Sequence, residues 1–323
     1  MDNPIVTILM PVYNAMSSID KTIDAILKQT NPNFKVLIID DCSTDGTYTY
    51  LKEKIKNDKR FTILKSPQNI GIGAMRDLLI SKCDTKYFFF LDDDDFIYKN
   101  AMKKMIKVAE KTDADMITSK YKIKFVWKKL FIVIMPPFYK WCGIKGASDF
   151  LLHNMTFFWG YFVKKEYYDS LNLIIGATFY EDVFPPVKMF LNARSYAHAN
   201  VYSIRYLRRK NSLSSYNPSW LEERLQGAYE GYKKACEFIY HSDEKPKYKA
   251  ALISHKMYQY FGVLFMFYDR LDAKDKLKII EHARNYFKPL GESVGWRPKF
   301  SLAPWKMYMN CYKKIVNVFK ERA

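Results

Sequence analysis

The sequence predicts an α/β fold, in which a mostly parallel sheet is covered by helices on both faces. Short, β-prone apolar runs alternate with segments whose apolar residues recur at helical spacing. Acidic residues directly follow two of those runs, at the strand ends where open sheets of this class bind their ligands. The chain has 323 residues, 49% of them hydrophobic, so it can bury a large core, and its composition excludes collagen-like and low-complexity proteins.

The strand and helix elements alternate from the start of the chain. The expected strands are Val6–Met10, Val36–Ile39, Phe61–Leu64, Tyr87–Leu91 and Met116–Thr118. The first helix is introduced by Ser17-x-x-Asp20, which has the spacing of a capping box, and a polar turn at 43–46 introduces the second. The next two helices are expected over Ile72–Ser81 and Lys99–Thr112.

The pattern becomes helical after Pro218. Apolar residues at spacings of three and four predict helices over Trp220–His241, Tyr248–Leu271 and Ala273–Phe287. We therefore expect an α/β domain over residues 1–217 and a helical C-terminal region over residues 218–323.

The positive charge lies in the second part of the chain. Of the formal net charge of +18, none comes from the first 100 residues, which carry 13 Lys and Arg against 14 Asp and Glu; the remainder carries 39 against 20. This asymmetry indicates an anionic partner, which on charge alone is a phosphorylated ligand, nucleic acid or anionic lipid. Five scattered cysteines without a C-x-x-C pair favour a reducing compartment, and no apolar run reaches the roughly 20 residues of a membrane-spanning helix.

The last segment, residues 304–322, is predicted to form a basic amphipathic helix with aromatic residues on its apolar face. Such a helix can lie in the headgroup layer of an anionic membrane, or it can pack on its own domain. The stretch Trp127–Phe131, with two lysines between aromatic residues, tilts the interpretation toward a membrane surface.

Four consecutive carboxylates, Asp92–Asp95, follow the fourth expected strand. Their mutual repulsion would raise their pKa values unless a cation lies among them. Carboxylate oxygens select Mg²⁺ or Mn²⁺, ions that keep coordination positions open for water and phosphate. The alternative is that Asp94 or Asp95 caps the following helix while the other carboxylates are solvated.

Four segments in this order resemble the signatures of the family 2 glycosyltransferases, whose catalytic domain has the GT-A fold. They are PVYNA (11–15), IIDDCSTDGT (38–47), NIGIGAMRD (69–77) and FFFLDDDD (88–95). The resemblance covers about residues 4–120, and it implies a nucleotide-sugar-binding half over 1–120 and an acceptor half over 121–217.

The resemblance also implies which residues contact the donor. The residues matching nucleotide-sugar contacts are Pro11, Val12, Tyr13, Asn14, Asp41, Arg76, Asp92 and Asp93, and those matching metal ligands are Asp94 and Asp95. From the sequence alone, Asp41 could instead cap the turn that follows it, and Arg76 could lie on an exposed helix face.

The family places an acidic pair well beyond this acidic run, and Glu181-Asp182 matches it. Asp182 is the expected catalytic base, which removes the proton of the acceptor hydroxyl, with Glu181 in support; the alternative is two exposed acids at a helix start. Trp159 resembles an acceptor-side residue, although a core tryptophan is an equal alternative. Arg209 and Ser212 match a segment that reaches the diphosphate, although this basic cluster could also be a solvated or lipid-facing loop.

These features together predict an inverting, metal-dependent glycosyltransferase. It would move a sugar from a nucleoside diphosphate sugar, with a UDP-sugar favoured, to a glycan or lipid-linked acceptor in cell-surface polysaccharide synthesis, using Mn²⁺ or Mg²⁺. We expect it in the cytoplasm or peripherally on the inner face of the plasma membrane, with an anionic membrane surface as a further partner and no nucleic acid partner. The alternatives are a sugar nucleotidyltransferase, which should carry a glycine-rich basic loop after the first strand, and a non-catalytic nucleic-acid binder, which does not need four aspartates at a strand end.

Overall fold

The computed structural model of the chain describes residues 3–124, 151, 157–176, 179–207, 218–265 and 271–295. These residues fall into two compact units. The first contains 3–124, 157–176 and 179–207, and the second contains Leu151, 218–265 and 271–295.

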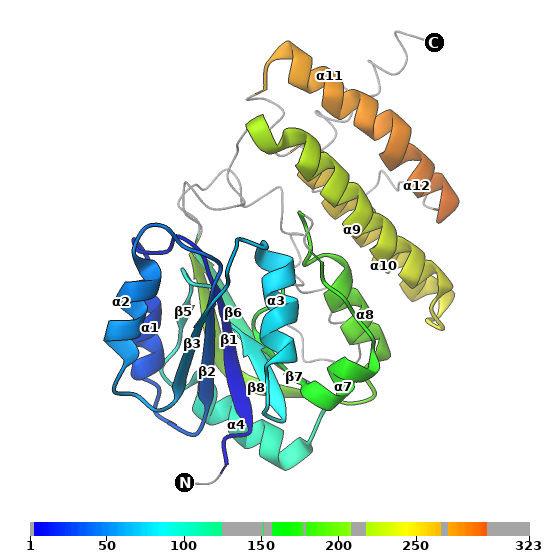
Figure 1. The fold of residues 1–323 in the computed structure, drawn as a ribbon. Coiled ribbons are helices and arrows are strands. Elements are labelled where there is room, and N and C mark those ends of the chain that lie inside the picture. The colour runs from blue at the N-terminus through cyan, green and yellow to red at the C-terminus, as the bar shows by residue number, and fades with distance from the viewer. Residues whose placement is uncertain are drawn as a thin grey trace. The chain divides into compact units, whose positions relative to one another are not determined.

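The described part of the first unit is built on one eight-stranded sheet with the strand order β3-β2-β1-β4-β7-β6-β8-β5 (Figure 1). Its strands are β1 (Val6–Val12), β2 (Lys35–Asp40), β3 (Phe61–Lys65), β4 (Tyr87–Phe90), β5 (Phe96–Ile97), β6 (Met116–Lys124), β7 (Tyr161–Lys164) and β8 (Tyr196–Leu207). Strands β3, β2, β1 and β4 are parallel, whereas β7 runs antiparallel to both β4 and β6, so the sheet is mixed. The alternation expected from the sequence is confirmed over the first 112 residues.

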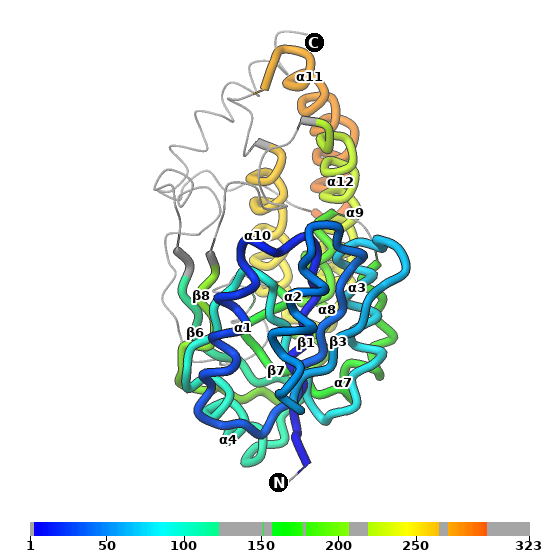
Figure 2. Tube along the Cα trace, turned by 60° about the vertical axis from the view of Figure 1, so that its left-hand side comes forward, coloured from blue at the N-terminus to red at the C-terminus, as the bar shows by residue number. Residues whose placement is uncertain are grey.

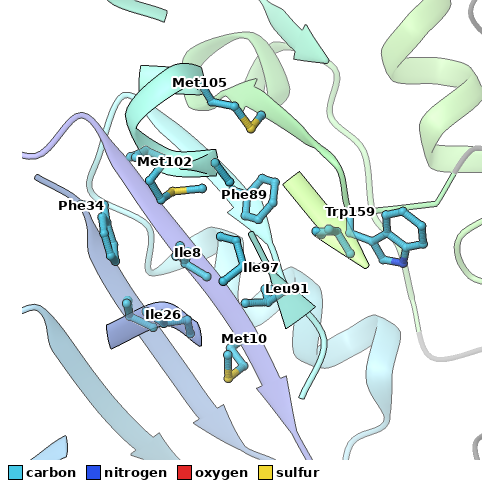
Figure 3. Close-up of a cluster of buried hydrophobic side chains, with 14 of the residues drawn as sticks. Ile8, Met10, Ile26, Phe34, Phe89, Leu91, Ile97, Met102, Met105 and Trp159 are labelled. Carbon is cyan, nitrogen blue, oxygen red and sulfur yellow. The ribbon is translucent and has the colours of Figure 1, made fainter. Parts of the chain in front are cut away.

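One face of the sheet is covered by α1 (Ile19–Leu27), α2 (Thr47–Ile55) and α4 (Ala101–Thr112). Alternate residues of β1, among them Ile8 and Met10, are fully buried there against helix residues such as Ile26 and Met102 (Figure 3). The period of two along β1 and the helical spacing along α1 and α4 therefore build one continuous core.

The other face carries α3 (Ile72–Ser81), α7 (Lys165–Ser170) and α8 (Phe184–Asn192), which Figure 1 shows on the opposite side of the sheet from α1 and α2. In the turned view of Figure 2, α1 lies to the left of β1 and α7 to its right. The aromatic strand β4 supplies the packing on both faces. Phe88 contacts Tyr168 of α7 edge to face, with ring centroids 5.3 Å apart, while Phe89 turns to the α1 side. Burial of such rings on both faces fixes β4, and with it the start of the acidic run.

The second unit is helical in its described part. Its helices are a short 3₁₀ turn η2 (Pro218–Trp220), α9 (Leu221–His241), α10 (Pro246–Phe265), α11 (Ala273–His282), a π-helical segment η4 (Ala283–Phe287) and α12 (Lys288–Ser293). Tyr232 of α9 stacks on Tyr260 of α10 at 5.0 Å, and the hydroxyl of Tyr260 lies 2.9 Å from His282 Nε2. None of the helices in the described residues combines the length and apolar character needed to cross a membrane. Residues 304–322 and Trp127–Phe131 lie outside the described residues.

Candidate active site

The carboxyl ends of three neighbouring strands lie next to one another. In the register of the sheet, Val12 of β1 pairs with Asp40 of β2, and Leu9 of β1 pairs with Phe90 of β4. The loops that follow these strands therefore start at one edge of the sheet, as the sequence predicts.

The turn after β1 is held between the turn after β2 and the acidic run. Asn14 adopts a left-handed backbone conformation (φ 47°), its amide donates to Ser43 Oγ at 2.9 Å, and its side-chain oxygen accepts from the Thr44 amide at 2.9 Å. The amide of Tyr13 points at Asp93 Oδ2, at 3.3 Å. The backbone of residues 11–15 thus lies against the segment that contains the acidic run.

The two aspartates at the end of β2 have separate roles. Asp40 is fully buried and accepts from the Ser43 amide at 2.9 Å, which closes the turn. Asp41 instead reaches the loop before α3, where its two carboxylate oxygens accept from the amides of Ile70 and Gly71 at 2.8 and 2.9 Å. Asp41 therefore fixes the start of α3 and does not cap its own turn.

The four aspartates of the acidic run differ in exposure. Asp92, Asp93 and Asp94 are half-buried, whereas Asp95 is 1% exposed, and its backbone carbonyl accepts from Thr22 Oγ1 at 2.9 Å. The short strand β5 separates the run from α4, whose N-cap residue is Asn100, so capping of that helix by Asp94 or Asp95 is excluded.

The acidic run fits a divalent metal that is shared with a ligand. Among the residues that the structure describes, no three His, Cys, Asp or Glu side chains converge as a metal-binding group. The half-buried carboxylates supply hard oxygen donors, and an ion of the Mg²⁺ type characteristically takes its remaining ligands from phosphate and water.

Arg76 lies at the centre of the site. Its side chain is 6% exposed; Nη1 donates to Glu181 Oε1 at 2.5 Å and Nη2 to Asp92 Oδ1 at 3.3 Å. Burial alone would lower the pKa of Arg76, but the nearby carboxylates of Asp92, Glu181 and Asp182 outweigh it and hold the pKa above its ordinary value. The guanidinium also lies over the ring of Phe158, 5.1 Å from its centroid. The alternative of an exposed Arg76 is therefore wrong.

Glu181 and Asp182 lie just before α8, after Tyr180 in a left-handed conformation (φ 61°). Both residues are half-buried, and the side chain of Glu181 is 11% exposed. Burial, and secondly the charge of Glu181, raise the pKa of Asp182 to about 7, against the opposing effect of Arg76. Asp182 can therefore hold or release a proton near neutral pH, which suits a general base.

The remaining candidates for acceptor or diphosphate contacts lie in the core or outside the described residues. Trp159 is 4% exposed and lies at the edge of the buried cluster (Figure 3). Its ring stacks on those of Phe157 and Tyr206, with centroids 4.5 and 5.7 Å away. Arg209 and Ser212 lie outside the described residues.

Sequence reasoning missed Asp77, which accepts from two backbone amides close to the acidic pair. The available signal was its position four residues after Gly73 in the same expected helix, which places the two residues on one helix face.

Known proteins match both the sequence and the fold. Residues 7–162 match the family described as Glycosyl transferase family 2. A processive diacylglycerol beta-glycosyltransferase of Mycoplasma genitalium is 24% identical over 302 residues, which is 86% of this chain and 86% of that protein. The Bacillus subtilis glycosyltransferase TuaG, named for teichuronic acid biosynthesis, is 34% identical over 104 residues; that match spans 32% of this chain and only 41% of TuaG.

A solved structure shows the same fold. The structure of S. aureus TarS 1–349 in complex with UDP-GlcNAc superposes with a TM-score of 0.68 and 17% identity, over 90% of this chain and 82% of that one. The mixed sheet and its flanking helices therefore have the fold of a protein that was solved in complex with UDP-GlcNAc.

Proposed function

Because the chain belongs to the family 2 glycosyltransferases and has the GT-A fold, we propose that it is an inverting enzyme using a nucleoside diphosphate sugar, with UDP-sugars favoured. The observation that carries this proposal is the link through Arg76 between Asp92 and Glu181. It brings a segment that would bind the donor to within one side chain of the acidic pair that would act on the acceptor.

Asp182 is the proposed catalytic base. In its carboxylate form it would take the proton of an acceptor hydroxyl while that oxygen attacks the anomeric carbon. Its raised pKa keeps it a better proton acceptor than an exposed aspartate. Glu181, held by Arg76, would contact the acceptor or support the base, because its carboxylate is fixed in direction by the ion pair.

The donor would lie across the loops after β1, β2 and β4. The proposed nucleotide-sugar contacts are Pro11, Val12, Tyr13, Asn14, Asp41, Arg76, Asp92 and Asp93. Asp94 and Asp95 would hold Mn²⁺ or Mg²⁺. Asp94 is the more exposed of these two aspartates. When bound, such an ion supplies positive charge that stabilises the leaving diphosphate.

The proposed acceptor is a membrane lipid hydroxyl or a glycan of the cell envelope. The relative that matches over most of both chains is named for diacylglycerol, and TuaG is named for a cell-wall polymer. The net charge of +18 supports work at an anionic membrane surface on the cytoplasmic side. Diacylglycerol is accordingly the first acceptor to test.

The test is a transfer assay with UDP-glucose, UDP-galactose and UDP-N-acetylglucosamine, each with Mn²⁺ and anionic vesicles containing diacylglycerol. We expect release of UDP and a glycolipid product with at least one donor, and neither from vesicles without diacylglycerol. Glycan acceptors form the second arm. Consumption of no donor in either arm would overturn the proposal.

A further inference from the structure

Helix α3 presents three residues, Gly73, Arg76 and Asp77, to one segment of the chain. Their spacing of three and four places them on the same helix face. The segment runs from Ile175 to Asp182, about 100 residues later in the sequence, and its residues 177 and 178 lie outside the described part. Each of the three helix residues contacts this segment in a different way.

Asp77 holds the beginning of the segment. Its Oδ1 accepts from the Ile175 amide at 3.0 Å, and its Oδ2 accepts from the Ile175 and Gly176 amides at 3.1 and 3.0 Å. A carboxylate that accepts from two successive amides fixes both the position and the direction of the backbone. Gly176 itself has a φ of 79°, a conformation that favours glycine.

Gly73 lets the same segment approach the helix backbone. A Cβ at this position would lie 1.7 Å from the carbonyl oxygen of Gly176 and 3.2 Å from Glu181 Cβ. Both the beginning of the segment and its acidic end therefore pack on the bare backbone of one residue. Arg76 adds the ion pair to Glu181 from the next turn of the helix.

We propose that Gly73 and Asp77 are positioning residues. Asp77 holds the amides of Ile175 and Gly176, Gly73 admits both Gly176 and Glu181 against the helix, and together these contacts set Glu181 and Asp182 opposite Asp92. The proposal rests on the proposed function of Asp182 as the base. Neither residue touches the reacting groups; they fix the distance between a donor-binding segment and an acceptor-activating one. That distance matters because a displacement of about 1 Å in a catalytic group can cost on the order of 100-fold in rate.

The first test compares Asp77→Asn with the matched surface variant Asp84→Asn, whose aspartate is exposed and pairs with Lys35. In Asp77→Asn the negative charge is lost and an NH₂ group comes to face the Ile175 amide, donor against donor, so we expect kcat for transfer to fall about 10- to 100-fold. The dissociation constant for UDP should stay within about twofold, because the donor loops are untouched. Asp84→Asn should change neither quantity. A kcat within twofold of the unmodified enzyme, or an equal loss of UDP affinity, would overturn the proposal.

Gly73→Ala provides the second variant, because its methyl group must displace the Gly176 carbonyl. We expect a loss of kcat without loss of UDP affinity, as for Asp77→Asn. A Gly73→Ala enzyme with unchanged kcat contradicts the assignment of Gly73.

Hydrogen exchange of the full chain tests the positioning role of Asp77 without an activity measurement. In the unmodified protein the amides of Ile175 and Gly176 should exchange slowly. In Asp77→Asn, exchange should accelerate both there and across residues 179–183, which Asp77 does not contact. Unprotected amides at 175 and 176, or acceleration confined to those two, would contradict positioning even if no sugar donor were ever found. A failure of the transfer assay alone would instead count against the proposed function.

Discussion

Arg76 and Glu181 form an ion pair with Nη1 and Oε1 2.5 Å apart, although 105 positions separate them in the chain. Both side chains are largely buried, at 6% and 11% exposed. The same guanidinium reaches Asp92, so one cation balances acidic groups from two distant motifs. Among the described residues, Arg76 is therefore the cation that balances the charge of both motifs.

Replacing Arg76 with methionine should destabilise the protein by about 3 kcal/mol at pH 8, because removing one partner of a buried ion pair leaves the other charges uncompensated. The loss should be smaller at pH 5, where the acidic groups can take up protons. Urea unfolding at the two pH values measures this difference. Arg194→Met, at an exposed arginine, is the control and should stay within about 0.5 kcal/mol. Equal losses in the two variants would contradict the central role of Arg76.

Asp182→Asn should abolish transfer while leaving UDP binding intact, because the base is lost and the donor loops are not changed. Asp94→Asn is the matched variant on the donor side, and it should weaken metal-dependent UDP binding as well as transfer. Isothermal titration with UDP and Mn²⁺ separates the two effects. Equal losses of UDP affinity in both variants would overturn the division of roles between these aspartates.

Asp182→Asn should also stabilise the fold at high pH. The pKa of Asp182 is raised in the folded state, so the protonated group contributes fully to the free energy of unfolding below the unfolded pKa near 3.8. That contribution is lost as the pH rises through the folded pKa of about 7. An uncharged side chain escapes that loss. Thermal unfolding should therefore show the variant to be more stable than the unmodified protein at pH 8, by on the order of 1 to 3 kcal/mol, with little difference at pH 4. If the variant gained more stability at pH 4 than at pH 8, the pKa of Asp182 could not be raised in the folded protein.

The sequence predicted the donor side of this site better than the acceptor side. The strands β1, β2 and β4 are apolar runs with clear ends, so the residues after Val12, Asp40 and Phe90 could be placed at one sheet edge from pattern alone. The long strand β8 was not predicted, because His198 and Asn200 interrupt its apolar pattern. The short β7 lies within an aromatic stretch that carries no turn signal at its end.

The role of Gly73 was also beyond pattern reasoning. A side chain at this position is excluded by the close approach of Gly176, which lies in a distant part of the sequence. Such a tertiary contact cannot be predicted from the residues around Gly73. Trp159 shows the same limit, since its burial depends on Phe157 and Tyr206. By contrast, the burial of Arg76 had a local signal, because Met75, Leu79 and Ile80 define the buried face of α3.

The pH dependence of transfer should report the carboxylate of Asp182. On the acid limb, kcat/KM should rise with pH as Asp182 loses its proton, with a midpoint near the raised pKa of about 7. Because the charge of Glu181 is one cause of that raised pKa, Glu181→Gln should move the acid limb to lower pH while also lowering the maximal rate. Glu166→Gln, at an exposed residue of α7, is the control and should leave the profile in place. Steady-state rates between pH 5 and 9, with the same donor and acceptor vesicles, provide the measurement. An acid limb that stays in place in Glu181→Gln would mean that another group is the base, because the proton on Asp182 cannot be indifferent to a carboxylate beside it.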